Sequence, residues 1–173
     1  VSYGVFMFVL RYRAGRHEKD VLRHFGEKSC SADGYDGSIP TGPSTFLCFT
    51  NRSGSNFVAN CLMSTGNFGD ISECFNAPIV VNQSRKLGCT SFPEYCAVVK
   101  RKKAGQGEAF AAKLSWNQLF FLRRIGMLDS IFADPRYVLV SWRDLVAQAL
   151  PLYTLYPPDD PLCAISRVLS LCY

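Results

Sequence analysis

Apolar residues gather in three short runs along the chain. The first, residues 44–50, is continuous and partly aromatic, which is typical of a strand buried on both faces of a parallel sheet. Residues 137–140 are apolar and β-branched and predict a second such strand. Between them, residues 108–115 are also predicted to form a strand.

Helical spacing follows these runs. Apolar residues recur at helical intervals from residue 57 to Gly66, where glycine predicts a helix stop. Residues 116–132 predict one amphipathic helix. Residues 144–150 predict another, which Pro151 limits. Because strands and helices alternate, the sequence predicts an α/β domain with a largely parallel sheet.

Three segments lie outside this pattern. Residues 1–43 begin basic and partly helical and end in a loop rich in Gly, Ser, Asp and Pro, so they are interpreted as an N-terminal extension or linker. Residues 67–107 are interpreted as mostly irregular, with the basic run at 100–103 in a solvated loop. Residues 154–173 are interpreted as a short atypical tail. The predicted domain therefore spans residues 44–153.

The composition indicates a folded and weakly basic protein. Of its 173 residues, 48% are hydrophobic and 19% are charged, which disfavours wholesale disorder. The net charge of +5 favours anionic ligands such as nucleotides but does not indicate a nucleic-acid partner. No apolar run reaches the roughly 20 residues that a transmembrane helix needs, so no membrane span is predicted.

The eight cysteines and two histidines do not have the spacing of a metal site. There is no CxxC pair and no His-x-x-x-His pattern, so neither zinc nor another metal is predicted. Cys48 lies within an apolar run, as reduced and buried thiols often do. This indicates a cytoplasmic, reducing location, while a lumenal compartment with some disulfides stays open.

The most distinctive local feature is a turn of small residues between the first strand and its helix. Backbone N–H groups and the helix dipole favour an anion at such a turn. Serine hydroxyls add donors, and an arginine adds a forked positive charge. The alternative is an ordinary turn in which a serine is the N-cap of the helix. The turn is not a Walker loop, because the GxxxxGK[ST] motif is absent. The turn comprises Asn51, Arg52, Ser53, Gly54, Ser55 and Asn56.

The residues around this turn resemble the Stf-zero, or trehalose 2-sulfotransferase-like, family of bacterial sulfotransferases. The matching blocks follow the order of the family. They are residues 45–55, 62–66, 73–75, 112–118, 134–135 and 144–149. The resemblance implies a parallel-sheet, three-layer, P-loop-like sulfotransferase fold. That fold is incomplete here, because the family continues with acceptor-side helices and another strand.

The resemblance implies an enzyme that moves a sulfuryl group from 3′-phosphoadenosine 5′-phosphosulfate (PAPS) to a hydroxyl of a carbohydrate or glycolipid. It assigns the phosphosulfate to residues 51–56, with Arg52 stabilising charge on the bridging oxygen. Glu73 matches the general base of the family. Lys113 is expected to contact the sulfate. No metal and no nucleic acid are implied, and homo-oligomerisation stays open.

Some positions depart from the family. Asn56 replaces the usual threonine at the end of the loop, and Trp142 stands where the family has an arginine for the 3′-phosphate. Arg143, one position later, is the candidate replacement. These departures favour an alternative, a catalytically inactive sulfotransferase-like remnant or binding module. A small nucleotide kinase is a third candidate, which the lack of a loop lysine disfavours.

Overall fold

The fold is built on a small parallel sheet. The computed structural model describes residues 17–33, 35–50, 53–132 and 134–141. Strands β1 (Ser44–Phe49), β2 (Phe110–Leu114) and β3 (Arg136–Val140) lie in the order β2-β1-β3, and β1 pairs in parallel with both neighbours. The prediction of an α/β chain with a parallel sheet is therefore confirmed.

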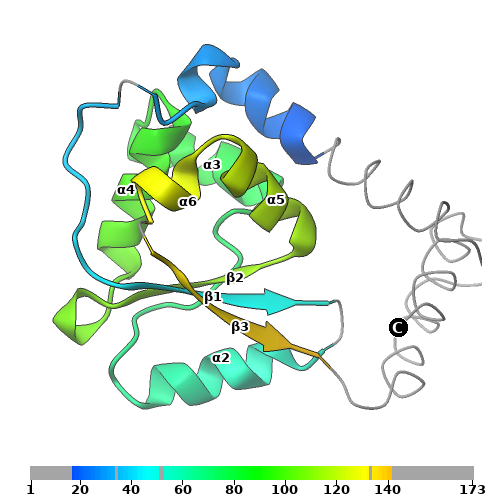
Figure 1. The fold of residues 1–173 in the computed structure, drawn as a ribbon, viewed down its shortest axis with the longest axis vertical. Coiled ribbons are helices and arrows are strands. Elements are labelled where there is room, and N and C mark those ends of the chain that lie inside the picture. The colour runs from blue at the N-terminus through cyan, green and yellow to red at the C-terminus, as the bar shows by residue number, and fades with distance from the viewer. Residues whose placement is uncertain (1–16, 34, 51–52, 133, 142–173) are drawn as a thin grey trace, which may run out of the picture.

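Helices cover both faces of the sheet (Figure 1). One face carries α2, and the other carries α3, α4, α5 and α6 together with a helical segment at residues 17–25. The α-helices are α2 (Ser55–Ser64), α3 (Ala77–Leu87), α4 (Phe92–Lys103), α5 (Trp116–Arg124) and α6 (Met127–Ser130). Two short 3-10 helices, η1 (Lys28–Cys30) and η2 (Gln106–Glu108), complete the described elements. The described part of the chain is thus a three-layer arrangement of helix, sheet and helix.

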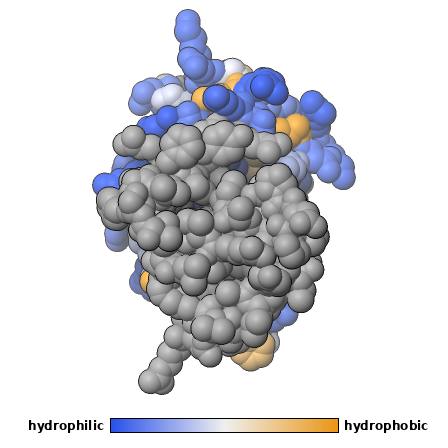
Figure 2. Space-filling model, turned by 90° about the vertical axis from the view of Figure 1, so that its right-hand side faces the viewer, coloured by the Kyte–Doolittle hydropathy of each residue, from blue (hydrophilic) through white to orange (hydrophobic). Residues whose placement is uncertain are grey.

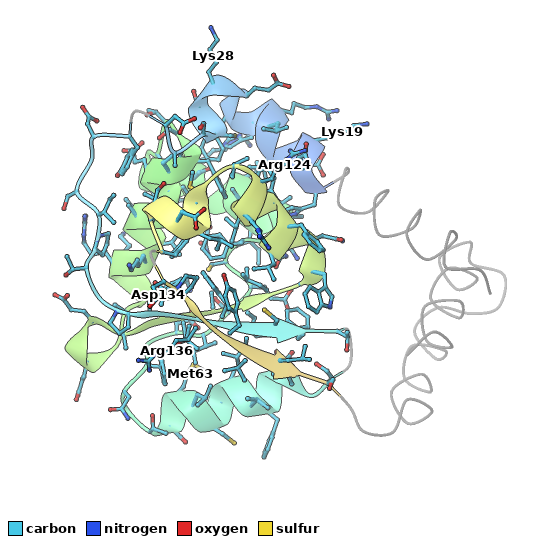
Figure 3. All side chains as sticks on the ribbon, in the orientation of Figure 1. Lys19, Lys28, Met63, Arg124, Asp134 and Arg136 are labelled. Atoms are coloured by element: carbon cyan, nitrogen blue, oxygen red, sulfur yellow. The ribbon has the colours of Figure 1, made fainter. Side chains whose placement is uncertain are left out.

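Alternate residues of β1 face the two helical layers. Phe46 and Cys48 belong to the larger hydrophobic cluster, which includes residues of α3 to α6. Leu47 and Phe49 belong to a smaller cluster with α2, and Met63 lies on the side of α2 that faces the sheet (Figure 3). Because side chains alternate along a strand, a strand covered on both faces is apolar at successive positions.

The 17–25 helix packs onto the larger layer. Val21 is fully buried, and Cys30 of η1 is 1% exposed in the same cluster as Phe46. Arg124 at the end of α5 forms an ion pair with Glu18 (Figure 3). Residues of the predicted N-terminal extension therefore contribute to the core.

The prediction that residues 67–107 are mostly irregular is wrong, because α3 and α4 occupy this region. Both helices carry proline in their first turn, where its missing N–H costs nothing. Ser91 is the N-cap of α4, and its hydroxyl accepts a hydrogen bond from Glu94 N. These prolines therefore begin helices within a segment that was predicted to be irregular.

The prediction of a solvated basic loop at residues 100–103 is also wrong. These residues are the last turn of α4, where positive charges interact favourably with the helix dipole. Lys100 is only 3% exposed, and its Nζ donates to the carbonyl of Ile131 at 3.2 Å. Burial lowers the pKa of Lys100.

The single helix predicted over residues 116–132 is divided in two. Gly126 adopts a left-handed conformation with φ 75° and separates α5 from α6. This backbone conformation favours glycine, so the chain can turn there without strain. The predicted helix at 144–150 lies outside the described residues.

Other predictions concern the surface and the thiols. Within the described ranges, no helix has the combined length and apolar character needed to cross a bilayer. The described residues that are visible in Figure 2, chiefly along its upper part, are mostly hydrophilic with a few hydrophobic spots. The six cysteines in these ranges are free thiols, and no cluster of three or more metal-binding side chains is found there.

The buried amine of Lys100 leads to a pH-dependent prediction. As the pH rises from neutrality toward 10.5, the ordinary pKa of lysine, wild-type protein is expected to gain stability relative to Lys100→Met. The lowered pKa means that the unfolded chain binds more protons than the folded chain in this window, so the free energy of unfolding rises with pH. Urea unfolding across this range measures the difference. If the free energies of unfolding of wild type and Lys100→Met change in parallel over this range, the prediction is contradicted.

Candidate functional site

The start of α2 lies at the carboxyl edge of the sheet, directly after β1 (Figure 1). Ser53 N donates to Thr50 O at 3.2 Å, which closes the turn between strand and helix. Gly54 is the N-cap, in a left-handed conformation with φ 76° and ψ 15°, and as a glycine it makes no side-chain cap hydrogen bond. Serine is therefore not the N-cap. The N-cap residue therefore supplies no acceptor to the first backbone N–H groups of α2, which are the groups that bind anions at helix termini.

Ser53 gives this turn an unusual polar group. The residue is 7% exposed, and its Oγ has no hydrogen-bond partner among the described residues. Ser44, at the opposite end of β1, is the other buried hydroxyl of this kind. A buried hydroxyl without a partner costs free energy, so an acceptor from a ligand would stabilise Ser53. Ser55, the first residue of α2, is also buried.

Three predicted site residues meet beside the start of α2. Lys113 Nζ of β2 donates to Asn56 Oδ1 in the first turn of α2 at 2.5 Å, and to Glu73 Oε1 at 3.1 Å. The Lys113 side chain is 6% exposed, and that of Glu73 is 34% exposed. The Nζ atom also lies 4.8 Å from the centre of the Phe49 ring, within the range of a cation–π contact. Lys113 thus contacts Asn56 and Glu73, which precede it in the sequence by 57 and 40 positions.

The segment that carries Glu73 is fixed on both sides. Before it, the backbone N of Lys113 donates to Ser72 O at 3.0 Å. After it, Tyr95 Oη of α4 donates to Cys74 O at 2.6 Å. Tyr95 is fully buried, and its pKa is strongly raised by that burial, so the phenol keeps its proton and remains a donor. Glu73 therefore projects from a backbone that is held to β2 and to α4.

Lys103 adds a further restraint to this segment. Its Nζ forms an ion pair with Asp70 and donates to Ser72 Oγ at 3.0 Å. Close backbone packing supports the contact, since a Cβ on Gly105 would meet Asn67 O at 2.5 Å. The last residue of the basic run thus positions the loop that carries Glu73.

The structure does not place every predicted site residue. Asn51 and Arg52 of the loop, and Arg143 near the predicted 3′-phosphate site, lie outside the described residues. Sequence reasoning missed Phe49, Tyr95 and Lys103. The aromatic residue at the end of the first strand was a usable signal, because strand ends of a parallel sheet meet at one edge.

No family model, curated protein or solved structure matches this chain. The resemblance to Stf-zero sulfotransferases therefore stays a prediction from sequence.

Three kinds of chemical group meet at this site. Glu73 offers a partly exposed carboxylate that can accept a proton, and Lys113 offers a fixed positive charge. The start of α2 offers backbone donors and an unpaired serine hydroxyl. Such a set suits the transfer of an anionic group to a hydroxyl.

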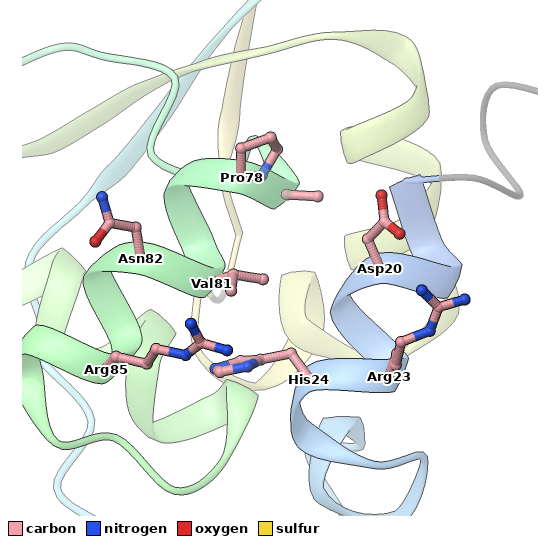
Figure 4. Close-up of a pocket in the computed structure, with 8 residues that line it drawn as sticks. Asp20, Arg23, His24, Pro78, Val81, Asn82 and Arg85 are labelled. Carbon is pink, nitrogen blue, oxygen red and sulfur yellow. The ribbon is translucent and has the colours of Figure 1, made fainter.

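A separate hollow lies between the 17–25 helix and α3 (Figure 4). It has a volume of about 540 Å³, and its lining includes Asp20, Arg23, His24 and Arg85. His24 Nε2 lies 2.7 Å from Ser84 Oγ, and burial, together with the charge of Arg85, lowers the pKa of His24. Because Ser84 is fully buried, this pair is not an accessible nucleophile and base.

Proposed function

We propose that this chain is a PAPS-dependent sulfotransferase that acts on a hydroxyl group of a carbohydrate or glycolipid. The observation that carries the proposal is the meeting of Asn56, Glu73 and Lys113 beside the start of α2. Glu73 and Lys113 come from two separate blocks of the sequence resemblance, and Asn56 directly follows a third. Ordinary core packing does not require a buried lysine, a carboxylate and an amide at one strand end.

The proposed reaction is an in-line displacement at sulfur. The acceptor oxygen forms a bond to sulfur while the bond from sulfur to the bridging phosphate oxygen breaks, and the bisphosphate nucleotide PAP leaves. Glu73 takes the proton of the acceptor hydroxyl. Lys113 faces the sulfonate oxygens, and the backbone N–H groups at the start of α2 hold the 5′-phosphate. Arg52, which lies outside the described residues, is proposed to stabilise charge on the bridging oxygen.

The remaining features of the proposal follow the resemblance. PAPS is a co-substrate, and the scheme needs no metal ion. A cytoplasmic location is proposed because the six cysteines among the described residues are free thiols. Burial raises the pKa of Cys74 to about 12 and that of Cys96 well above its ordinary value. Such thiols are weak nucleophiles, as expected of structural cysteines.

A second candidate is a sulfotransferase-like module that binds the nucleotide without transferring the sulfuryl group. The observation that favours it is the ion pair between Lys113 and Glu73, which occupies the proposed base. Trp142 in place of the arginine for the 3′-phosphate also favours it. Transfer of labelled sulfate from PAPS to sugars distinguishes the two, because only the enzyme labels an acceptor.

PAP is expected to raise the melting temperature of the protein. A ligand that binds only the folded state stabilises it by about 2.7 kcal/mol at one hundred times its dissociation constant. Differential scanning fluorimetry over a PAP titration measures the shift. Adenosine, which has no phosphate, is the matched ligand control and is expected to give no shift.

Asn56→Asp is the matched protein control for this titration. The substitution keeps the shape of the side chain but adds a negative charge at the proposed phosphate site, so PAP affinity is expected to fall at least tenfold. The free protein should remain stable, because an acidic residue is favourable in the first turn of a helix. If PAP shifts neither protein at millimolar concentration, the proposed function is wrong.

A further inference from the structure

Lys113 is already engaged by protein groups on several sides. Its ammonium group has three N–H donors. Glu73 Oε1 and Asn56 Oδ1 accept from it, and the Phe49 ring covers another side. With 5% of the residue exposed, Lys113 has little room to add a partner without giving one up.

A sulfonate at the start of α2 would compete for this same ammonium group. Asn56 belongs to the first turn of α2, so its contact with Lys113 brings the Nζ atom to the end of the helix where anions are favoured. Glu73 is the negatively charged partner of Lys113 and the more exposed of the two. The sulfonate and the Glu73 carboxylate would share the ammonium group of Lys113, so binding of the sulfonate weakens the interaction between Lys113 and Glu73.

We propose that Lys113 exchanges partners, from the Glu73 carboxylate to the sulfonate of the nucleotide. The inference rests on the proposed function and adds an order of events. The sulfonated nucleotide binds first, and by drawing Lys113 away it releases the Glu73 oxygen that receives the proton of the acceptor. The acceptor then enters a site with a free base.

The exchange predicts that removal of the Glu73 charge strengthens binding of PAPS. Glu73→Gln is expected to bind PAPS about tenfold more tightly than wild type does, because the sulfonate then has no charged competitor for Lys113. PAP lacks the sulfonate, so its affinity should change much less. Calorimetric titration with each nucleotide, in the absence of an acceptor, measures both effects.

A double-mutant cycle with Lys113 separates exchange from simple repulsion between charges. In a Lys113→Met background, Glu73→Gln is expected to leave the affinity for PAPS unchanged. Lys113→Gln is a second background that keeps a polar side chain, and circular dichroism establishes that each variant is folded. If Glu73→Gln raises the affinity for PAPS equally with and without Lys113, the effect is general charge repulsion between Glu73 and the nucleotide. That result would overturn the exchange of partners.

The outcomes also separate this inference from the proposed function. If PAP binds wild type but Glu73→Gln does not tighten PAPS, the partner exchange is wrong and the nucleotide site stands. If neither nucleotide binds the folded wild type or the folded Glu73→Gln variant, the proposed function fails and the exchange fails with it. Preferential tightening of PAPS that disappears with Lys113 supports both.

Discussion

Replacement of Phe46 by alanine is expected to lower the free energy of unfolding by about 3–5 kcal/mol. Phe46 is fully buried in the central strand β1. Its ring lies 5.2 Å from that of Phe132 and 6.4 Å from that of Phe75, in edge-to-face arrangements. Phe132 follows α6 and Phe75 precedes α3, so the substitution leaves a cavity where the helical layer meets the sheet.

Phe57→Ala is the matched control for this measurement. Phe57 is 73% exposed on α2, so its loss removes little buried surface and is expected to change stability by about 0.5 kcal/mol or less. Urea unfolding followed by circular dichroism reports both variants. Equal losses of stability in the two variants would show that Phe46 is not at the centre of the core.

The sheet was predictable because its signal is local. Residues of β1 are buried on both faces, so successive apolar residues marked the strand without knowledge of its neighbours. The strand β3 carried a similar pattern, but Tyr137 and Leu139 are 51% and 63% exposed. Local composition thus located the strands, whereas their order β2-β1-β3 and their exposure depend on contacts distant in sequence.

The helices α3 and α4 were missed for a physical reason. The buried face of α3 includes Ser84, a polar residue that interrupts the apolar spacing and bonds with His24 instead. The basic end of α4 resembles a solvated loop, although Lys100 is buried and donates to Ile131 O. Tertiary contacts of this kind satisfy polar groups inside the fold, and no local pattern reports them.

The candidate site was predictable in part. Parallel strands bring their carboxyl ends to one edge, so residues after β1 lie beside the end of β2, whereas the sequence assigned Lys113 to the site only through the family resemblance. The contact of Asn56 with Lys113 has this origin. The position of Glu73 depends instead on Tyr95 and Lys103, which hold the flanking residues through hydrogen bonds. Those partners come from α4, a helix that the sequence pattern did not reveal.

Glu73→Gln is expected to reduce sulfuryl transfer by about 10²–10⁴-fold, the usual contribution of a general base. The amide keeps the size of the side chain and cannot accept the proton of the acceptor hydroxyl. Transfer of labelled sulfate from PAPS to a panel of mono- and disaccharides, at saturating nucleotide, measures the loss as a fall in kcat. Glu27→Gln, an exposed carboxylate in the 3-10 turn region, is the matched control and should transfer at the wild-type rate.

Melting temperature, nucleotide affinity and turnover of Glu73→Gln together show whether Glu73 acts as a base. A merely structural loss would lower the melting temperature and weaken PAP binding, whereas loss of the base leaves the fold and the nucleotide site intact. Because Lys113 is paired with Glu73, the same substitution is expected to favour PAPS binding while it removes turnover. Tighter ground-state binding with slower chemistry is the signature of a group that acts in the transition state. Undiminished transfer by Glu73→Gln would assign the proton to another acceptor and leave the carboxylate as a partner of Lys113 alone.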